Sequence, residues 1–296
     1  MDRPAPSRAA ELGALVRELG LPSTAVEDAL APFERPKVSR HEGYLFFTVY
    51  ATRLRPHDHL DPTKGRLVLG RLSAIMTPHA LVTIRLDDEI DLAPIMKVWQ
   101  DNADLLVHGA GALVHGLLDV IVDGHFDTIQ ALDEETESLE DVLFAEGSPQ
   151  AAGFIRRIYG LRKDLVALRR TVLPMREVVN GVQRHRTGKR TELDSWFDDL
   201  YDHALRAGEW SESLRDMVTT MFEAHLSLQD SRLNQIMKKL AGWAAIIAVP
   251  TAITGWFGQN VPYWGFNQPW GVLLSLGMIL VASVTLYVVF RFNDWV

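Results

Sequence analysis

Two apolar runs near the end of the chain decide its fold: Leu240–Gly258, LAGWAAIIAVPTAITGWFG, and Pro269–Phe290, PWGVLLSLGMILVASVTLYVVF. They are 19 and 22 residues long, and no charged residue occurs between Leu240 and Phe290. A helix of about 20 residues, rising about 1.5 Å per residue, crosses the roughly 30 Å hydrocarbon core of a bilayer. The sequence therefore predicts two transmembrane helices. The alternative is a pair of buried core helices, which seldom run this long without a charge.

The charges beside these runs predict their orientation. Lys238 and Lys239 precede the first run and Arg291 follows the second, whereas the loop 259–268 carries no charge. Because basic residues stay on the cytoplasmic side, we expect both termini in the cytoplasm. The first residues, MDRPAPSRAAEL, contain no apolar stretch, so we expect no cleavable signal peptide.

Composition separates the chain into two chemically different parts. Its 296 residues carry a net charge of −8, and the mean hydropathy is close to neutral at +0.01. Arg291 and Asp294 cancel, so the whole negative charge lies before residue 240. This acidic balance argues against duplex nucleic acid as a partner. The absence of cysteine excludes disulfides, thiolate catalysis and Cys-ligated zinc or iron–sulfur sites.

The part before the apolar runs divides into two regions. Residues 1–110 mix helix and strand signals, with an aromatic strand at Tyr44–Arg53, two further apolar runs in Arg66–Arg85 and a polar connecting loop at Pro56–Gly65. We predict a cytoplasmic α/β domain here. Residues 111–239 are predicted to form long helices and a stalk, and residues 240–296 the transmembrane domain, with spans at about 240–258 and 269–290.

Three long helices are expected in the middle region. Apolar residues recur at helical spacing from about Ala112, with an acidic run at Asp133–Asp141, and a basic helix follows over Phe154–Val182. A short break between them makes an antiparallel, charge-complementary hairpin plausible. The third helix starts near Leu193 and meets no break before the first apolar run. A helix of that length predicts a stalk that associates with copies of itself.

Small and polar residues recur every three or four positions along the first span. Two interpretations stand: small residues let helices pack closely in membranes, or several copies of this face line a water-filled pore. Leu240 borders the stripe and, with Met237, would form an apolar ring able to gate by dewetting. The stripe consists of Asn234, Met237, Ala241, Ala244, Ala248, Thr251 and Gly255.

The tripeptide Gly258-Gln259-Asn260 closes the first of these two C-terminal spans. In that position it resembles the signature of the CorA family of divalent-cation channels, which have two transmembrane spans and a Gly-x-Asn motif. The commonest form is Gly-Met-Asn, and zinc-transporting ZntB relatives carry other middle residues. Further similar segments are LPSTAVEDAL at 21–30, ERPKV at 34–38, LPMREV at 173–178, FDDLYDH at 197–203 and NQIMK at 234–238.

The resemblance implies an α+β cytoplasmic domain, a long stalk helix and a CorA-like pentameric funnel in a bacterial inner or plasma membrane. The expected partners are four further copies of the chain, membrane lipid and divalent cations, with no nucleic acid. The transported ion would be Mg²⁺, with Co²⁺ or Ni²⁺ also possible. Asn260 carboxamides at the entrance, Thr251 hydroxyls and Gly255 carbonyls would hydrogen-bond the ion's hydration shell. The alternative for Asn260 is a simple turn residue before Val-Pro.

The sequence departs from the family pattern at three places. The opening β-strand is missing or shortened, the basic C-terminal cluster is reduced to Arg291, and Gln259 replaces the usual Met. Because of the last departure, a ZntB-type zinc transporter is an alternative, either with or without coupling to protons. A membrane-tethered scaffold or enzyme is a further alternative, but no Ser-His-Asp pattern, phosphate-binding glycine loop or HExxH motif supports an enzyme. No catalytic cofactor is expected.

Regulation by intracellular Mg²⁺ is a second implication of the resemblance. Asp199 falls where the family's stalk carboxylate binds Mg²⁺ between subunits, and Asp58 and Asp61 are guesses for its partner. Asp199 is equally consistent with a solvated helix start, where the helix dipole stabilises carboxylates. The neighbouring His57-Asp58-His59 cluster offers zinc ligands, although a merely hydrophilic loop has the same composition.

Overall fold

A computed structural model describes residues 23–31, 34–56, 64–144, 151–185, 192–259 and 262–296 of the chain. The chain divides into two compact units, residues 1–222 and 223–296. Helix α7, Glu192–Phe257, is 66 residues long and contributes to both units. The predicted third helix is thus confirmed, with no break between its start beside Leu193 and the end of the first apolar run.

The first unit contains a four-stranded antiparallel sheet in the order β1-β2-β3-β4. Strand β2 pairs with β3 through ten residues, from Leu45 opposite Met76 to Leu54 opposite Leu67. Strands β2 and β3 thus form an antiparallel hairpin across the predicted polar loop, although residues 57–63 of that loop lie outside the described residues. The strands are β1 (Lys37–His41), β2 (Tyr44–Leu54), β3 (Leu67–Met76) and β4 (Leu81–Arg85).

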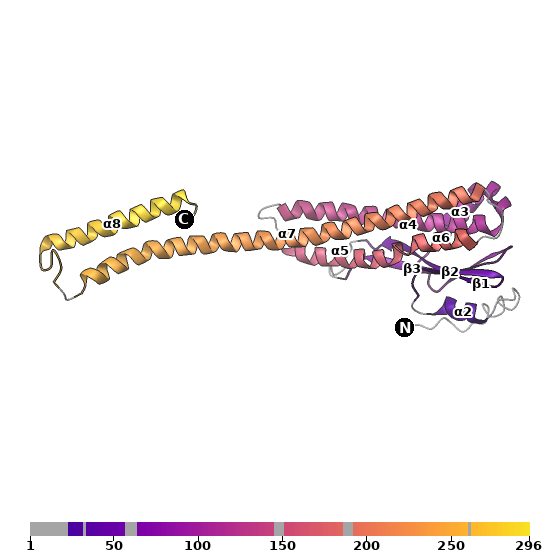
Figure 1. The fold of residues 1–296 in the computed structure, drawn as a ribbon, viewed down its shortest axis with the longest axis horizontal. Coiled ribbons are helices and arrows are strands. Elements are labelled where there is room, and N and C mark those ends of the chain that lie inside the picture. Colours follow the sequence, from indigo (N-terminus) through magenta and orange to yellow (C-terminus); the bar gives the residue numbers. More distant parts are fainter. Residues whose placement is uncertain (1–22, 32–33, 57–63, 145–150, 186–191, 260–261) are drawn as a thin grey trace. The chain divides into compact units, whose positions relative to one another are not determined.

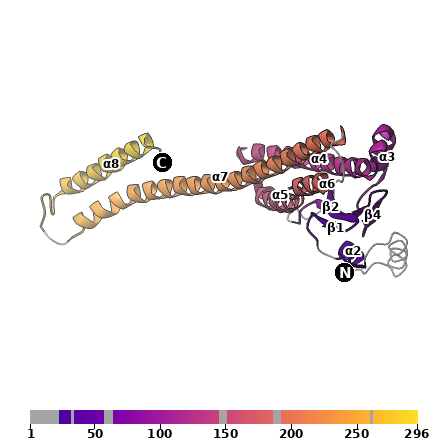
Figure 2. The ribbon, with the colours of Figure 1, turned by 45° about the vertical axis from the view of Figure 1, so that its right-hand side comes forward.

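Both faces of this sheet are covered, which explains why β2 is almost continuously apolar. Phe47 and Leu72 belong to the main core with the long helices. Phe46 and Ile75 point to the other face, where Ala29 of helix α2 (Ser23–Leu30) completes a smaller core. Figure 2 shows α2 on one side of the sheet and the long helices on the other.

The remaining helices of this unit cover the sheet and each other (Figure 1). Helix α6 approaches β1 so closely that a Cβ at Gly181 would lie 2.2 Å from Val38 Cγ1, so only glycine fits there. The acidic α4 and the basic α5 pack together as predicted, but the basic helix expected over Phe154–Val182 is divided by a turn at Leu173–Pro174 into α5 and α6. Glu135 of α4 forms an ion pair with Arg66, and Arg169 of α5 forms one with Glu212 of α7. The helices are α3 (Ala93–Asp101), η1 (Ala103–His108), α4 (Ala110–Phe144), α5 (Ala151–Val172) and α6 (Met175–His185).

Arg71 is a buried cation that holds α2 on the sheet. It lies on β3 with 5% of its surface exposed. Its guanidinium donates to the carbonyls of Asp28, Ala29 and Ala31, at the C-terminal end of α2, and to Ser73 Oγ. The last carbonyls of a helix lack partners within the helix and carry its negative dipole end. Arg71 therefore supplies both the donors and the charge that this end requires.

His125 of α4 is completely buried beside the sheet. Its Nε2 donates to the carbonyl of Tyr50 on β2 at 2.8 Å, while Nδ1 has no partner among the described residues. Burial disfavours the charged imidazolium and lowers the pKa of His125 to about 4. The side chain is therefore neutral in the folded protein at neutral pH.

Acid should destabilise the protein through this histidine. Between pH 6.5 and about pH 4 the unfolded chain binds a proton at His125 that the folded chain does not, so stability falls as pH falls through that window. Over this whole window the free energy of unfolding falls by about 3 kcal/mol because of His125. We expect the melting temperature of the detergent-purified protein to drop less between pH 7 and pH 4.5 in His125→Gln, whose amide can still donate to Tyr50. Equal drops would show that His125 does not govern acid stability.

Candidate ion-conduction surface

In the second unit, one face of α7 is covered by α8 (Pro269–Phe292) and the C-terminal residues. Gly242 is buried, and a Cβ on it would lie 2.9 Å from Val296 Cγ2 and 3.0 Å from the carbonyl oxygen of Trp295. The rings of Trp243 and Tyr287 are 6.5 Å apart. The wholly or partly buried residues of α7 recur at helical spacing: Gly242, Ala245, Ile246, Val249, Pro250, Ile253 and Phe257.

The predicted stripe occupies a different face of α7, which the chain leaves uncovered. Every one of its members is exposed, and Met237 and the bordering Leu240 have 61% and 62% of their surfaces accessible. A Cβ at Gly255 would meet no atom within 4 Å. The uncovered positions are Asn234, Met237, Leu240, Ala241, Ala244, Ala248, Thr251 and Gly255. This face is uncharged, and most of its side chains are small. It can therefore pack closely against another helix or border a water-filled pore.

Threonine hydroxyls beside Pro250 are tied to the helix backbone. Thr251 Oγ1 donates to the carbonyl of Ile247 at 3.2 Å, and Thr254 Oγ1 donates to that of Pro250 at 2.8 Å. Pro250 itself has no N–H to donate within the helix. Because the Thr251 hydroxyl donates its hydrogen bond to the backbone, its oxygen has acceptor lone pairs available on the uncovered face.

The loop after α7 begins with two ordered backbone turns. The N–H of Gly258 donates to the carbonyl of Thr254 at 2.8 Å, and that of Gln259 to Trp256 at 3.3 Å. The hydroxyl of Tyr263 donates back to the carbonyl of Phe257 at 2.9 Å. Gly258 and Gln259 therefore follow directly from the end of the uncovered face, whereas Asn260 lies outside the described residues.

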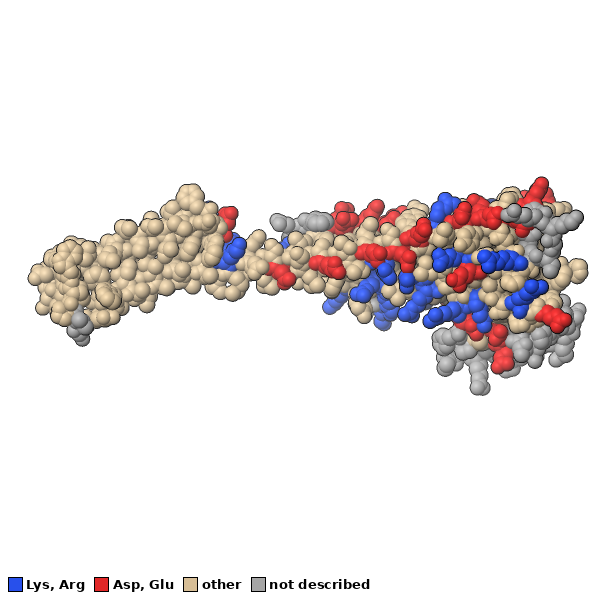
Figure 3. Space-filling view, in the orientation of Figure 1, with Lys and Arg blue, Asp and Glu red and all other residues tan. Residues whose placement is uncertain are grey.

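The second unit carries its charges at one end only (Figure 3). Lys238 and Lys239 precede the apolar part of α7, and Arg291 lies at the end of α8, where its guanidinium donates to the carbonyl of Val296 at 3.3 Å. Aromatic rings lie at both ends: those of Trp264 and Trp270 are 5.0 Å apart at the connecting loop, and those of Trp243 and Tyr287 are 6.5 Å apart toward the charged end. Tryptophan and tyrosine at both ends and charges at one end match the interfacial pattern of membrane helices.

The proposed regulatory carboxylate, Asp199, is exposed near the start of α7. Its Oδ2 lies 3.8 Å from His203 Nε2, one turn further along the helix. The described residues contain no group of three or more histidine and carboxylate side chains arranged to hold a metal ion. Asp58 and Asp61, like His57 and His59, lie outside the described residues, so the partner suggested for Asp199 remains a prediction.

The structure instead brings carboxylates of α4 toward His203, a grouping that the sequence analysis missed. Burial raises the pKa of Asp123, the charges of Asp119 and Asp127 raise it further, and that of His203 lowers it. Phe126 lies edge-on to His203 with ring centroids 6.1 Å apart. The spacing of these three aspartates along α4, four residues apart, was the available signal. Only the fold shows that α7 runs beside them.

Helices α7 and α8 are both long and apolar enough to cross a membrane, and their most apolar windows are 6% and 0% buried within the chain. This exposure does not fit the alternative of two core helices in a soluble protein. A family model described as CorA-like Mg²⁺ transporter protein matches residues 3–292. The chain belongs to this family. It is therefore a member of a family of membrane-embedded divalent metal transporters rather than of an enzyme class.

Individual CorA relatives agree with this assignment. The cobalt/magnesium transport protein CorA of Thermotoga maritima is 27% identical over 280 residues, covering 93% of this chain and 77% of the relative. That of Methanocaldococcus jannaschii is 28% identical over 290 residues, covering 97% and 88%. The complete structure of the M. jannaschii CorA magnesium transporter matches 97% of this chain and 88% of its own, with a TM-score of 0.75 and 25% identity.

A ZntB protein shares the fold more distantly. The cytoplasmic domain of ZntB from Vibrio parahaemolyticus covers 75% of this chain and 84% of its own, with a TM-score of 0.56 and 13% identity. At that identity the match shows a common fold of the cytoplasmic part and carries no information on the ion.

Proposed function

We propose that five copies of this CorA-family chain form a channel that conducts Mg²⁺ through a pore lined by α7. The observation that carries the proposal is the uncharged face of small and polar residues that one chain leaves uncovered and that leads directly to Gly258 and Gln259. The number five and the entrance role of Asn260 come from the family resemblance. Both termini would lie in the cytoplasm, on the side of Lys238, Lys239 and Arg291.

The chemistry of this face suits a hydrated hard cation. Mg²⁺ holds its waters tightly and prefers oxygen ligands. The waters around the ion donate hydrogen bonds outward, and the Thr251 oxygen can accept them because its own proton is engaged with Ile247. No carboxylate occurs in either span, so the ion would not be trapped by charge. A membrane potential of about 100 mV would supply roughly 4.6 kcal/mol per divalent ion.

Leu240 and Met237 are suited to form the gate. Both are more than half exposed on the uncovered face, one turn apart. A ring of such apolar side chains can close a pore by excluding water from it, even where the side chains do not touch one another. Asn234 would then lie on the cytoplasmic side of this gate and offer an amide to ions that leave it.

Zinc transport is the alternative for the same pore. Gln259 replaces the Met usual in the signature and adds a polar amide beside the entrance. The absence of cysteine restricts zinc ligands to histidine and carboxylate, and neither occurs on the uncovered face. We therefore propose Mg²⁺ first, with Co²⁺ or Ni²⁺ as further cargo.

Asn260→Ala should reduce Mg²⁺ uptake into proteoliposomes by at least about tenfold, because an amide ring at the entrance would be lost. The matched control is Gln268→Ala, which removes an exposed amide from the same loop, one that makes no capping hydrogen bond to α8. The control should transport at the wild-type rate. Normal transport by Asn260→Ala would favour the turn-residue interpretation and weaken the case for an ion entrance here.

Asp199→Ala should weaken inhibition of the channel by internal Mg²⁺. Cations bridging stalk carboxylates of adjacent copies would offset their repulsion and hold the closed state, and the aspartates of α4 would add to that repulsion. Uptake should therefore persist at internal Mg²⁺ concentrations that close the wild type. Asp216→Ala removes another exposed carboxylate of α7 as a control. Unchanged inhibition in Asp199→Ala would reduce Asp199 to a helix-start carboxylate.

A further inference from the structure

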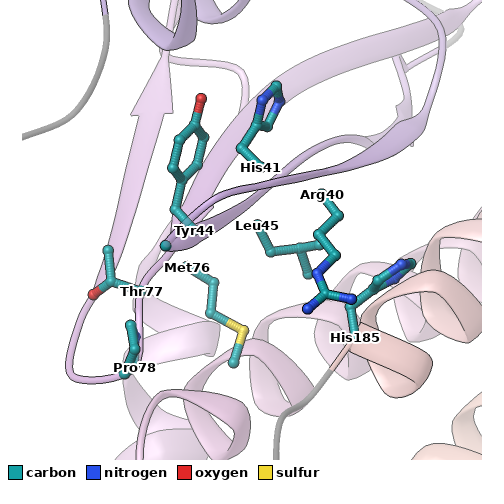
Figure 4. Close-up of a pocket in the computed structure, with 9 residues that line it drawn as sticks. Arg40, His41, Tyr44, Leu45, Met76, Thr77, Pro78 and His185 are labelled. Atoms are coloured by element: carbon teal, nitrogen blue, oxygen red, sulfur yellow. The ribbon is translucent and has the colours of Figure 1, made fainter.

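A cavity of about 220 Å³ lies at one end of the sheet, in the first unit. It is open to solvent on one side and is bordered by the β1–β2 turn, the β3–β4 turn and the C-terminal end of α6 (Figure 4). None of these segments belongs to the proposed pore. Its principal lining residues are Arg40, His41, Tyr44, Met76, Thr77 and His185.

Basic side chains line this cavity and no carboxylate does. Within the described part of the chain, the Arg40 guanidinium makes neither a hydrogen bond nor an ion pair. Figure 4 shows it beside the His185 ring, although the two groups come from β1 and α6. Glu42, in the adjacent turn, is not among the lining residues. Arg40 and His185 thus converge with no counter-ion among the described residues.

The two histidines are held in place by their surroundings. His185 Nδ1 donates to the carbonyl of Gly181 at 2.6 Å, which leaves Nε2 as its remaining polar atom. His41 stacks on Tyr44 with ring centroids 4.6 Å apart and an interplanar angle of 7°. Both histidine rings are exposed at the cavity, and these contacts restrict their orientation there.

We propose that this cavity binds a compact phosphate group between Arg40 and His185. A guanidinium matches two phosphate oxygens at once with parallel hydrogen bonds, and a protonated imidazole adds a further charge-assisted donor. The volume limits the ligand, because pockets for larger organic molecules measure about 300–1,000 Å³. Inorganic phosphate or a small phosphate monoester fits this limit better than a nucleotide. The proposal is independent of which ion the pore conducts.

Phosphate binding to the detergent-purified full-length chain tests this directly. Isothermal titration in chloride buffer with inorganic phosphate should show one saturable site per chain in the millimolar range or tighter. Arg40→Gln and His185→Gln should each weaken binding by about tenfold or more, which corresponds to about 1.4 kcal/mol. Arg184→Gln is the matched control, since it removes an exposed charge next to His185 that does not line the cavity. It should bind as the wild type does.

Two further arms make the result decisive. Titration with AMP separates free phosphate from a nucleotide as the source of the group, and we expect AMP to bind more weakly. Arg40→Lys keeps the charge but loses the paired donors, so it should bind phosphate with intermediate affinity. It also tests the role of Arg40 if the Arg40→Gln variant does not fold. Absence of saturable phosphate binding by the wild type, or equal affinity in Arg40→Gln and the Arg184→Gln control, would overturn the proposal.

Discussion

Ala248→Phe should reduce Mg²⁺ flux through the reconstituted protein by more than about tenfold, because a ring of five phenylalanines would fill a pore lined by small residues. Ala248 lies in the middle of the uncovered face of α7, away from the residues that pack on α8. Its replacement therefore leaves the packing within one chain unchanged. The measurement is the initial rate of Mg²⁺ entry into proteoliposomes that contain equal amounts of correctly assembled protein.

The control for this substitution is Val284→Phe. Val284 is 52% exposed and lies on the face of α8 turned away from α7, where a larger apolar side chain would meet only lipid. It should leave the flux close to that of the wild type. If Ala248→Phe also conducts normally, or only prevents assembly of the oligomer, the stripe is a helix-packing face and not a pore.

Arg71→Leu should destabilise the first unit by about 3 kcal/mol, the largest stability change that we expect in the chain. The substitution removes donors from three carbonyls at the end of α2 and from Ser73, in a site that solvent barely reaches. Buried acceptors that lose their partners cost about 1–3 kcal/mol each, although relaxation recovers part of this. The measurement is the free energy of unfolding, or the melting temperature, of the purified protein.

Arg55→Leu is the corresponding control. Arg55 follows β2 and its side chain is exposed. Its hydrogen bonds with Arg66 use the backbone: the N–H of Arg55 donates to the carbonyl of Arg66, and the carbonyl of Arg55 accepts from the Arg66 guanidinium. Surface substitutions of this kind change stability by about 0.5 kcal/mol or less. Arg71→Lys should fall between the two, because it retains the cation at the helix end but loses the fork of donors. A loss in Arg71→Leu no larger than in Arg55→Leu would show that α2 is held by apolar contacts alone.

Local sequence patterns predict much of this fold. The two apolar runs predict α7 and α8 because nothing but a membrane or a partner accommodates so long a stretch without charge. Strand β2, Tyr44–Leu54, follows from its aromatic and β-branched residues, and β3, Leu67–Met76, from one of the apolar runs in Arg66–Arg85. The small-residue stripe was predicted from spacing alone, and the structure shows that α8 covers a different face.

The remaining features depend on contacts between distant segments. Arg71 meets carbonyls about 40 residues earlier in the chain, and no local pattern distinguishes it from a surface arginine. The phosphate cavity combines two strand turns with the end of α6, and Asp123 approaches His203 only because α4 and α7 run side by side. Asn260, Asp58 and Asp61 lie outside the described residues and remain predictions from the resemblance.

Ion flux into proteoliposomes tests most directly whether this chain forms a Mg²⁺ channel. Vesicles with an interior-negative potential should take up Mg²⁺ through the wild-type protein, and the rate should rise with the potential, as expected for a channel driven by about 4.6 kcal/mol per ion at 100 mV. A pH gradient without a potential should not drive uptake. Zn²⁺ flux without Mg²⁺ flux, or uptake that requires the pH gradient, would contradict the account.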